Sequence, residues 1–140
     1  MNMKKNTFSL LLCLFLFLGV TLVSCDKPEP EEPDVTYSII GHWKLDNVFQ
    51  ETPYNHVDMT NMYGQNFQLI FKEDSTLITT DGINETEMQW TLNGDQLGFI
   101  QAAGMAPVMY TVLKLTKDSL SIENGSGTDY VTTMNLHRVY

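Results

Sequence analysis

Cysteine is nearly absent from this chain, which has only Cys13 and Cys25 among its 140 residues. Cys13 lies inside an apolar run, residues 8–23, that has the character of a removable leader. The mature chain would then keep a single cysteine, which cannot form an internal disulfide. A domain in an oxidising compartment without that cross-link must be held together by its own apolar core.

Positive charge is also scarce. The chain has 8 Lys and Arg residues against 17 Asp and Glu residues, which gives a formal net charge of −9. Loss of Lys4 and Lys5 with the leader leaves 6 against 17, or −11. Nucleic-acid binding and adhesion to anionic lipid by charge both need a basic face, so these classes are excluded. We interpret the acidity as a means of keeping the protein soluble.

Catalytic patterns are missing as well. Residues 125–127, Gly-Ser-Gly, lack the strand-to-helix setting that a nucleophilic serine requires. His42 and His137 are expected on the outer face of neighbouring strands, without the third ligand that a zinc site requires. No pair of nucleophile and base stands out elsewhere. The sequence therefore predicts a protein that is not an enzyme and that binds no metal and no cofactor.

The amino-terminal segment has the pattern of a secretory signal. Lys4 and Lys5 precede the run FSLLLCLFLFLGVTLV, residues 8–23, which contains no charged side chain. This run is shorter than the roughly 20 residues of a membrane-spanning helix. Its basic start and small-residue end fit a signal peptide over residues 1–24. A single-span membrane anchor is the alternative.

The end of this run resembles the lipobox of bacterial lipoproteins, in the order Leu22-Val23-Ser24-Cys25. The resemblance implies that the Cys25 thiol receives a diacylglyceryl group and that the chain is cut before this residue. The new amino terminus would then be acylated, with palmitate as the expected chain. Such an anchor is far stronger than one acyl chain alone. The alternative is an ordinary secreted protein with a free terminal cysteine.

Acidic residues and prolines follow the cysteine, in the stretch DKPEPEEPD, residues 26–34. It has no large apolar side chain to bury, and its prolines and like charges favour an extended chain. Residues 25–38 are therefore predicted to be a tether, which at about 3.1 Å per residue could hold a domain roughly 40 Å from a bilayer. Acid beside a lipidated cysteine also resembles the surface-export signals of some Gram-negative gut and oral bacteria. This resemblance implies an outer-membrane lipoprotein displayed on the cell surface.

From residue 39 onward, short runs alternate between apolar and polar residues, as in Phe67, Leu69 and Phe71. A period of two predicts β-strands, and no stretch has a convincing helical period beyond a turn or two within residues 52–64. In the sixth strand the apolar positions change phase between residues 110–112 and 113–115, which indicates a β-bulge or burial on both faces. The predicted strands are residues 39–49, 66–72, 76–80, 87–92, 96–101, 108–116, 119–123 and 130–139.

Short and long connections alternate strictly along the chain. The short turns are residues 72–76, 93–95 and 116–119, and the longer links are residues 50–65, 81–86, 102–107 and 124–129. In an up-and-down arrangement, alternate connections lie at opposite ends, so one end is closed by short turns and the other carries the long loops. The sequence thus predicts an all-β fold, an eight-stranded antiparallel up-and-down barrel with a mouth, over residues 39–140.

The first and last strands resemble those of lipocalins. Gly41-x-Trp43 stands at the start of the first strand, and Arg138 lies near the end of the last. The resemblance implies that Arg138 packs over Trp43 at the closed end in a cation–π contact. The middle of the chain, with FKEDSTL, EMQWTLNGDQL and VLKLTKDSLSIEN, is similar to small bacterial lipocalin-like domains. The chain departs from animal lipocalins in its shorter domain, its missing carboxy-terminal helix and its lack of a disulfide.

Aromatic and methionine side chains near the expected mouth are the candidate ligand contacts, because they suit an adaptable apolar pocket. They are Phe49, Tyr54, Met59, Met62, Tyr63, Phe67, Met88, Trp90, Phe99, Tyr110, Tyr130 and Met134. An eight-stranded barrel encloses an interior that side chains can fill or that can hold one small ligand. The same residues could therefore form a plain packed core.

Two functions remain open. The first is a membrane-anchored, lipocalin-like binding protein, a monomer that holds a small apolar or amphipathic molecule at the open end of the barrel, with the first long loop as a lid. The second is a surface interaction or structural module with a filled barrel, which contacts protein or glycan through its long loops. An empty space in the barrel interior would favour the first function, and a packed interior the second.

Overall fold

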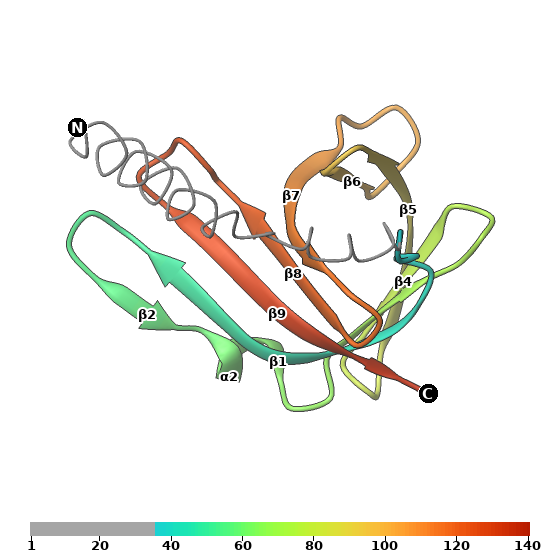
Figure 1. Ribbon diagram of the computed structural model, residues 1–140, viewed down its shortest axis with the longest axis horizontal. Helices are drawn as coiled ribbons and strands as arrows, with labels where there is room; N and C mark the ends of the chain where they lie inside the picture. The colour runs from blue at the N-terminus through green and yellow to red at the C-terminus, as the bar shows by residue number, and fades with distance from the viewer. Residues whose placement is uncertain (1–35) are drawn as a thin grey trace, which may run out of the picture. The chain divides into compact units, whose positions relative to one another are not determined.

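Residues 36–140, the part of the chain that the computed structural model describes, are built almost wholly of antiparallel β-strands (Figure 1). The strands are β1 (Gly41–Glu51), β2 (His56–Asp58), β3 (Gln68–Phe71), β4 (Thr76–Thr80), β5 (Glu85–Asn93), β6 (Gln96–Ile100), β7 (Val108–Leu115), β8 (Ser119–Asn124) and β9 (Val131–Val139). One helical turn, α2 (Thr60–Tyr63), lies between β2 and β3. The expected signal peptide, the lipidated Cys25 and the tether up to residue 35 lie outside the described residues.

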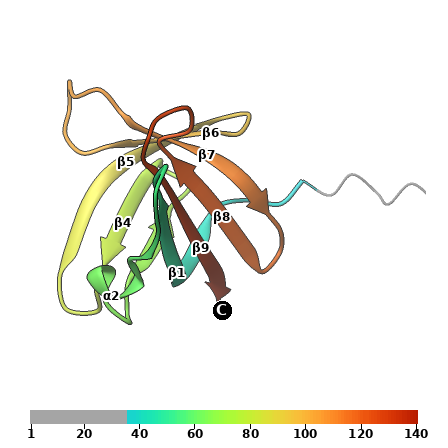
Figure 2. The same ribbon diagram turned by 90° about the vertical axis from the view of Figure 1, so that its left-hand side faces the viewer.

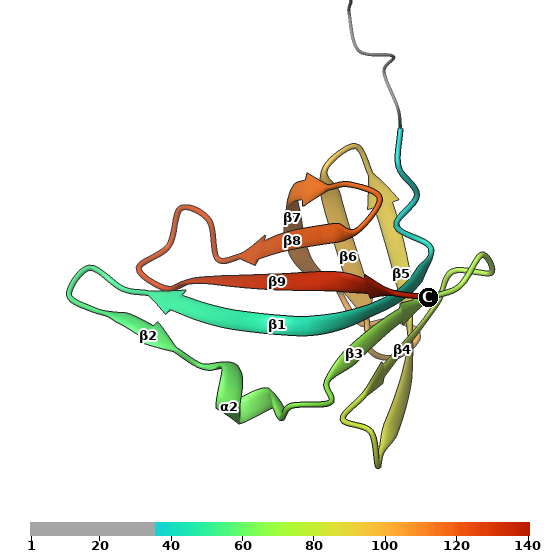
Figure 3. The same cartoon turned by 60° about the horizontal axis from the view of Figure 1, so that its bottom comes forward.

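Pairing of the first and last barrel strands closes the sheet. The strands follow the order β2-β1-β3-β4-β5-β6-β7-β8-β9, and β1 also pairs with β9, beside which it runs in Figures 1 and 3. Around the ring, β4 and β5 lie on one side and β8 and β9 on the other (Figure 2). The predicted fold class is confirmed: β1 and β3–β9 form a closed eight-stranded antiparallel up-and-down barrel, which is consistent with a lipocalin-like fold.

The eight predicted strands are all present, with ends shifted by a few residues. The sequence does not predict β2, which pairs with the last residues of β1. Its three side chains are all exposed, so they leave no alternation of apolar and polar residues to recognise. The helical turn expected within residues 52–64 corresponds to α2. The bulge expected in the sixth strand is confirmed by a shift of register between Val112 and Lys114 of β7.

The two ends of the barrel differ, as the connections predict. Short turns at residues 72–75, 94–95 and 116–118 form what we call the closed end. The links at residues 52–67, 81–84, 101–107 and 125–130 surround the opposite end, which we call the open end. Three of these links are longer than any turn of the closed end, and the link at 81–84 is as long as the turn at 72–75.

Large apolar side chains fill the interior next to the short turns. Trp43, Phe71, Leu77, Leu97 and Leu120 are at most 1% exposed, and the last four lie within two residues of those turns. The indole nitrogen of Trp43 donates a hydrogen bond of 2.7 Å to the carbonyl of Ile39, so its polar atom is satisfied inside the core. Burying one such side chain stabilises the fold by about 1.5–3 kcal/mol. The closed end is therefore the rigid base of the barrel.

Arg138 covers the closed end of the barrel from outside. Its guanidinium carbon lies 4.2 Å from the centre of the Trp43 ring, which confirms the predicted cation–π contact. The same group donates hydrogen bonds of 2.7–2.8 Å to the carbonyls of Ser38, Ile40 and Lys117. One side chain thus ties the chain ahead of β1 to the turn between β7 and β8.

Gly41 makes room for this arrangement. Its φ of +136° is one that residues with a side chain rarely adopt. A Cβ at this position would also collide with Nη1 of Arg138. The glycine of the Gly-x-Trp pattern is therefore required both by its backbone conformation and by the close approach of the arginine.

Candidate functional site

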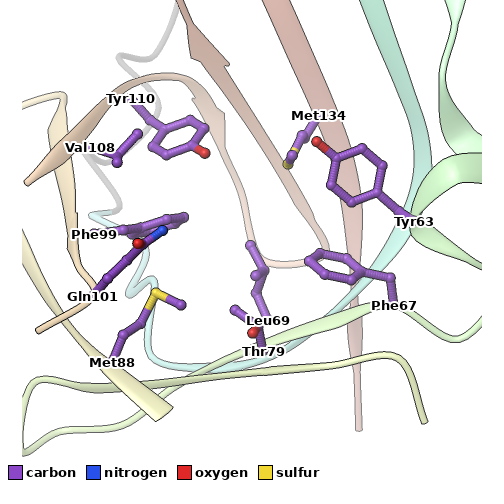
Figure 4. A pocket seen from close by; sticks show the side chains of 10 residues that line it. All are labelled: Tyr63, Phe67, Leu69, Thr79, Met88, Phe99, Gln101, Val108, Tyr110 and Met134. Carbon is purple, nitrogen blue, oxygen red and sulfur yellow. The ribbon is translucent and has the colours of Figure 1, made fainter. Parts of the chain in front are cut away.

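A cavity of about 200 Å³ lies inside the barrel at the open end and is partly open to solvent (Figure 4). Its aromatic lining consists of Tyr63, Phe67, Phe99 and Tyr110. The aliphatic and sulfur-containing lining consists of Leu69, Met88, Val108 and Met134, and the polar lining of Thr79 and Gln101. The interior is thus packed at the closed end and hollow at the open end.

The alternation along the strands brings these residues together. Leu69 of β3 is paired directly with Thr79 of β4, and Phe99 of β6 with Val108 of β7. Tyr110 follows Val108 by two positions, so both face the interior. Lining residues on one strand therefore recur two apart, and the neighbouring strand supplies the residue opposite.

The aromatic side chains form two pairs on opposite sides of the opening. Figure 4 shows Tyr63 and Phe67 on one side and Phe99 and Tyr110 on the other. The ring centres of Tyr63 and Phe67 are 5.3 Å apart with an edge-to-face angle of 72°. Those of Phe99 and Tyr110 are 4.7 Å apart at 39°. Such contacts stabilise the rings against each other and hold them in place before a ligand arrives.

A few polar atoms interrupt this apolar wall. The Tyr63 and Tyr110 hydroxyls, the Thr79 hydroxyl and the Gln101 amide can each orient a bound molecule by hydrogen bonding. Burial raises the pKa of the Tyr110 phenol above its ordinary value, and the nearby Tyr63 phenol raises it further. Tyr110 is therefore neutral at physiological pH and can donate its hydroxyl proton.

The raised pKa of Tyr110 predicts how the stability of the fold changes at alkaline pH. Because the folded-state pKa of Tyr110 lies above its unfolded value near 10, its contribution to stability is complete below that value. The contribution is lost as pH rises through the folded-state pKa. We expect Tyr110→Phe to reduce the loss of unfolding free energy between pH 9 and about 11.5, measured by urea denaturation. The fully exposed Tyr54 supplies the control, since Tyr54→Phe should follow the wild type. An equally steep loss in Tyr110→Phe would contradict the assignment.

Six of the candidate ligand contacts line the cavity. They are Tyr63 of the first long loop, Phe67, Met88, Phe99, Tyr110 and Met134. Met59 lies outside the lining and packs against the apolar core. Contact of any of these residues with a ligand stays a prediction.

The expectation that Phe49 points into the barrel is wrong. A shift of register between Leu45 and Asn47 of β1 changes which residues face inward after that point. Val48 is consequently fully buried, whereas Phe49 stacks on His56 of β2 with ring centres 4.8 Å apart. The alternation that begins at Trp43 therefore does not extend to the end of the strand.

Four other candidates also lie away from the cavity. Tyr54, Met62 and Tyr130 are 91%, 77% and 63% exposed, so they belong to the loop surface. Trp90 packs edge-on against Phe71, and its indole donates a hydrogen bond of 3.2 Å to the carbonyl of Lys72 in a short turn. These contacts place Trp90 toward the closed end, two residues beyond Met88 along β5.

Four residues that line the cavity are not among the candidates predicted from the sequence. Leu69 and Val108 each lie two positions from a candidate, Phe67 and Tyr110, so strand alternation could have identified them. Thr79 could have been found in the same way from the fully buried Leu77. Gln101 lies two positions after the candidate Phe99, so strand alternation places it on the same face, although its side chain is polar and adds nothing to the apolar pattern.

Two kinds of feature are absent from residues 36–140. No three His, Cys, Asp or Glu side chains gather there in a way that could hold a metal ion. In the same part of the chain, no helix has the length and apolar character needed to cross a membrane. Among known proteins, no family model, curated protein or solved structure matches the chain.

Proposed function

We propose that this chain is a membrane-anchored, lipocalin-like binding protein that holds a small apolar or amphipathic molecule at the open end of its barrel. The observation that carries this proposal is the apolar cavity of about 200 Å³ among the long loops. Ligand sites in proteins are concave and mostly apolar, with a few polar groups that fix orientation. The cavity has this composition.

The size of the cavity limits the ligand. An apolar cavity of about 150 Å³ can hold benzene, whereas pockets for drug-sized molecules measure about 300–1,000 Å³. A cavity of about 200 Å³ therefore accepts one ring or a short branched or acyl group, with any remaining part of the ligand outside the mouth. A whole long-chain lipid would not be enclosed.

The point at which the tether joins the barrel determines which way the cavity would face. Ser38 lies at the closed end, where its carbonyl accepts a hydrogen bond from Arg138. The preceding residues therefore join the barrel at the end opposite to the cavity. With the expected lipid anchor at Cys25, the mouth of an outer-membrane lipoprotein would face away from the bilayer, toward whatever it binds.

Native mass spectrometry of the full chain purified from its own host tests the binding function. We expect a small molecule to co-purify with the barrel. Val108→Trp should lower its occupancy at least tenfold, because the larger side chain would enter the cavity. Met109→Trp is the matched control, since Met109 is 41% exposed against 40% for Val108 and does not line the cavity. Repeated absence of a bound molecule, together with failure to bind a dye that reports apolar pockets, would refute the proposal.

One observation favours the second function, a surface module that contacts protein or glycan. Each link of the open end carries an exposed apolar side chain, with Tyr54, Ile83, Met105 and Tyr130 as examples. Exposed apolar groups gathered at one end of a domain mark interaction surfaces. If this were the function, the quadruple change of these residues to serine would abolish partner capture, and Val108→Trp would leave it unchanged.

A further inference from the structure

The lining of the cavity is rich in aromatic rings and sulfur atoms and contains no basic side chain. The two aromatic pairs, Tyr63 with Phe67 and Phe99 with Tyr110, lie on opposite sides of the space (Figure 4). Aromatic faces carry partial negative charge, and a cation placed among them is attracted electrostatically. The Met88 and Met134 side chains add polarizable sulfur to the same wall.

The charged side chains around the mouth are also negative. Within residues 36–140, the basic side chains are Lys44, Lys72, Lys114, Lys117 and Arg138, and none belongs to the links of the open end. Those links carry Asp58, Asp81 and Asp129 instead. A mouth lined with one sign of charge draws ligands of the opposite sign toward a low-dielectric cavity.

Two of these carboxylates are held in the ionised form by hydrogen bonds. Asp81 accepts bonds of 2.7–2.8 Å from the backbone N–H groups of Ile83 and Asn84, and these bonds lower its pKa to about 2. Thr60 lowers the pKa of Asp58 as well, first through its side-chain hydroxyl and second through the bond from its backbone N–H. The negative charge at the open end therefore persists across the physiological range of pH.

His56, the histidine of these links, does not make the charge at the open end positive. His56 stacks on Phe49, which does not line the cavity, and its ring nitrogen lies 3.5 Å from a carboxylate oxygen of Glu51. An anionic ligand head would therefore enter the cavity without a compensating positive group, and burial of an unpaired charge is costly.

We propose that the molecule held in this cavity is a cation, with an alkylated ammonium group seated among Tyr63, Phe67, Phe99 and Tyr110. This inference rests on the proposed binding function and specifies its ligand class. The aromatic rings replace part of the water lost by the ammonium group, and its alkyl substituents pack on Leu69 and the methionines. Recognition of quaternary ammonium groups by aromatic side chains uses the same physical principle.

Three probes of equal shape and different charge test the inference. They are choline, its neutral carbon isostere 3,3-dimethylbutan-1-ol, and the anion 3,3-dimethylbutanoate. Affinity is measured on the full chain in nanodiscs free of choline lipids, with empty nanodiscs as the blank. We expect choline to bind at least tenfold more tightly than the alcohol, and the anion to bind least.

Substitutions of Tyr110 test whether the aromatic rings of the cavity cause the preference for choline over the alcohol. Tyr110→Phe keeps the aromatic face and should retain the tenfold preference, whereas Tyr110→Leu should remove most of it and change the affinity for the alcohol little. A preference that survives Tyr110→Leu in full would refute the role of these rings.

The possible failures are distinguishable. If the alcohol binds as tightly as choline, the cation inference is wrong and the binding function stands. If all three probes fail while the apolar dye still binds, the cation inference is wrong and the cavity still binds apolar molecules. If the dye fails as well, both proposals are wrong.

Discussion

Replacing Arg138 with alanine is expected to lower the free energy of unfolding by about 3 kcal/mol, because one change removes several contacts. The guanidinium lies over Trp43 and donates hydrogen bonds to the carbonyls of Ser38, Ile40 and Lys117. Hydrogen bonds from charged donors contribute about 1.5–3 kcal/mol each in favourable cases, and water can replace part of that at this surface. For a domain of this size, the melting temperature would fall by roughly 10–20 °C.

Urea denaturation monitored by tryptophan fluorescence measures the effect. Arg138→Lys should recover only part of the loss, since an ammonium group cannot form the same fork of bonds to separate carbonyls. Lys114→Ala is the matched control for charge, because this exposed lysine should contribute less than about 0.5 kcal/mol. If Arg138→Ala unfolds at the same urea concentration as Lys114→Ala, the arginine does not stabilise the closed end.

Gly41 provides a second check on the same arrangement. A Cβ there would meet Nη1 of Arg138, so Gly41→Ala is expected to displace the guanidinium as well as strain the backbone. The double variant Gly41→Ala with Arg138→Ala should therefore lose less stability than the sum of the single variants. Additive losses would show that the two residues act independently.

The barrel could be predicted because its signals are local. Alternation such as Phe67, Leu69 and Phe71 marks a strand, and the alternation of short and long connections places the mouth. The bulge in β7 could also be predicted, since apolar residues there change phase across Val112 and Lys114. Each of these features depends on a few neighbouring residues, which is why the sequence alone reveals them.

The cavity and its lining depend on features that are not local. In β1 the adjacent apolar residues Val48 and Phe49 both fit a strand, and only the register against β9 determines that Val48 faces inward. Trp90 shares a face with Met88 but lies closer to the closed end, where it is partly buried and packs against the core. Whether inward side chains fill a barrel or leave a space depends on their joint packing, and alternation does not report it.

The tightly packed core and the proposed binding site lie at opposite ends of this barrel. The closed end contains Trp43, Arg138 and several fully buried side chains, and the chain enters there through Ser38. The open end has the longer links and the cavity. The packed base supports the strands that carry Phe99 and Tyr110, whereas Tyr63 and Phe67 belong to the link between β1 and β3. Many scaffolds likewise carry binding residues on loops.

Replacing Cys25 with alanine is expected to remove the protein from the outer-membrane fraction and to abolish its labelling by palmitate. A lipobox cysteine would carry a diacylglyceryl group and an amino-terminal acyl chain, and each buried methylene contributes about 0.8 kcal/mol to membrane binding. The acidic residues that follow cannot replace this anchor by charge, because an anionic surface repels them. Loss of the thiol should therefore remove nearly all of the affinity of the mature chain for the bilayer.

Cys13→Ala is the matched control for this experiment. Cys13 lies in the apolar run that the predicted cleavage discards, so its loss should change neither fractionation nor labelling. Membranes are separated by density, and the mature mass is measured to detect cleavage before residue 25. If Cys25→Ala stays in the outer-membrane fraction or keeps the palmitate label, the proposed lipid anchor is wrong. The prediction that the mouth faces away from the bilayer would then be wrong too, because it requires attachment through the residues that enter at the closed end.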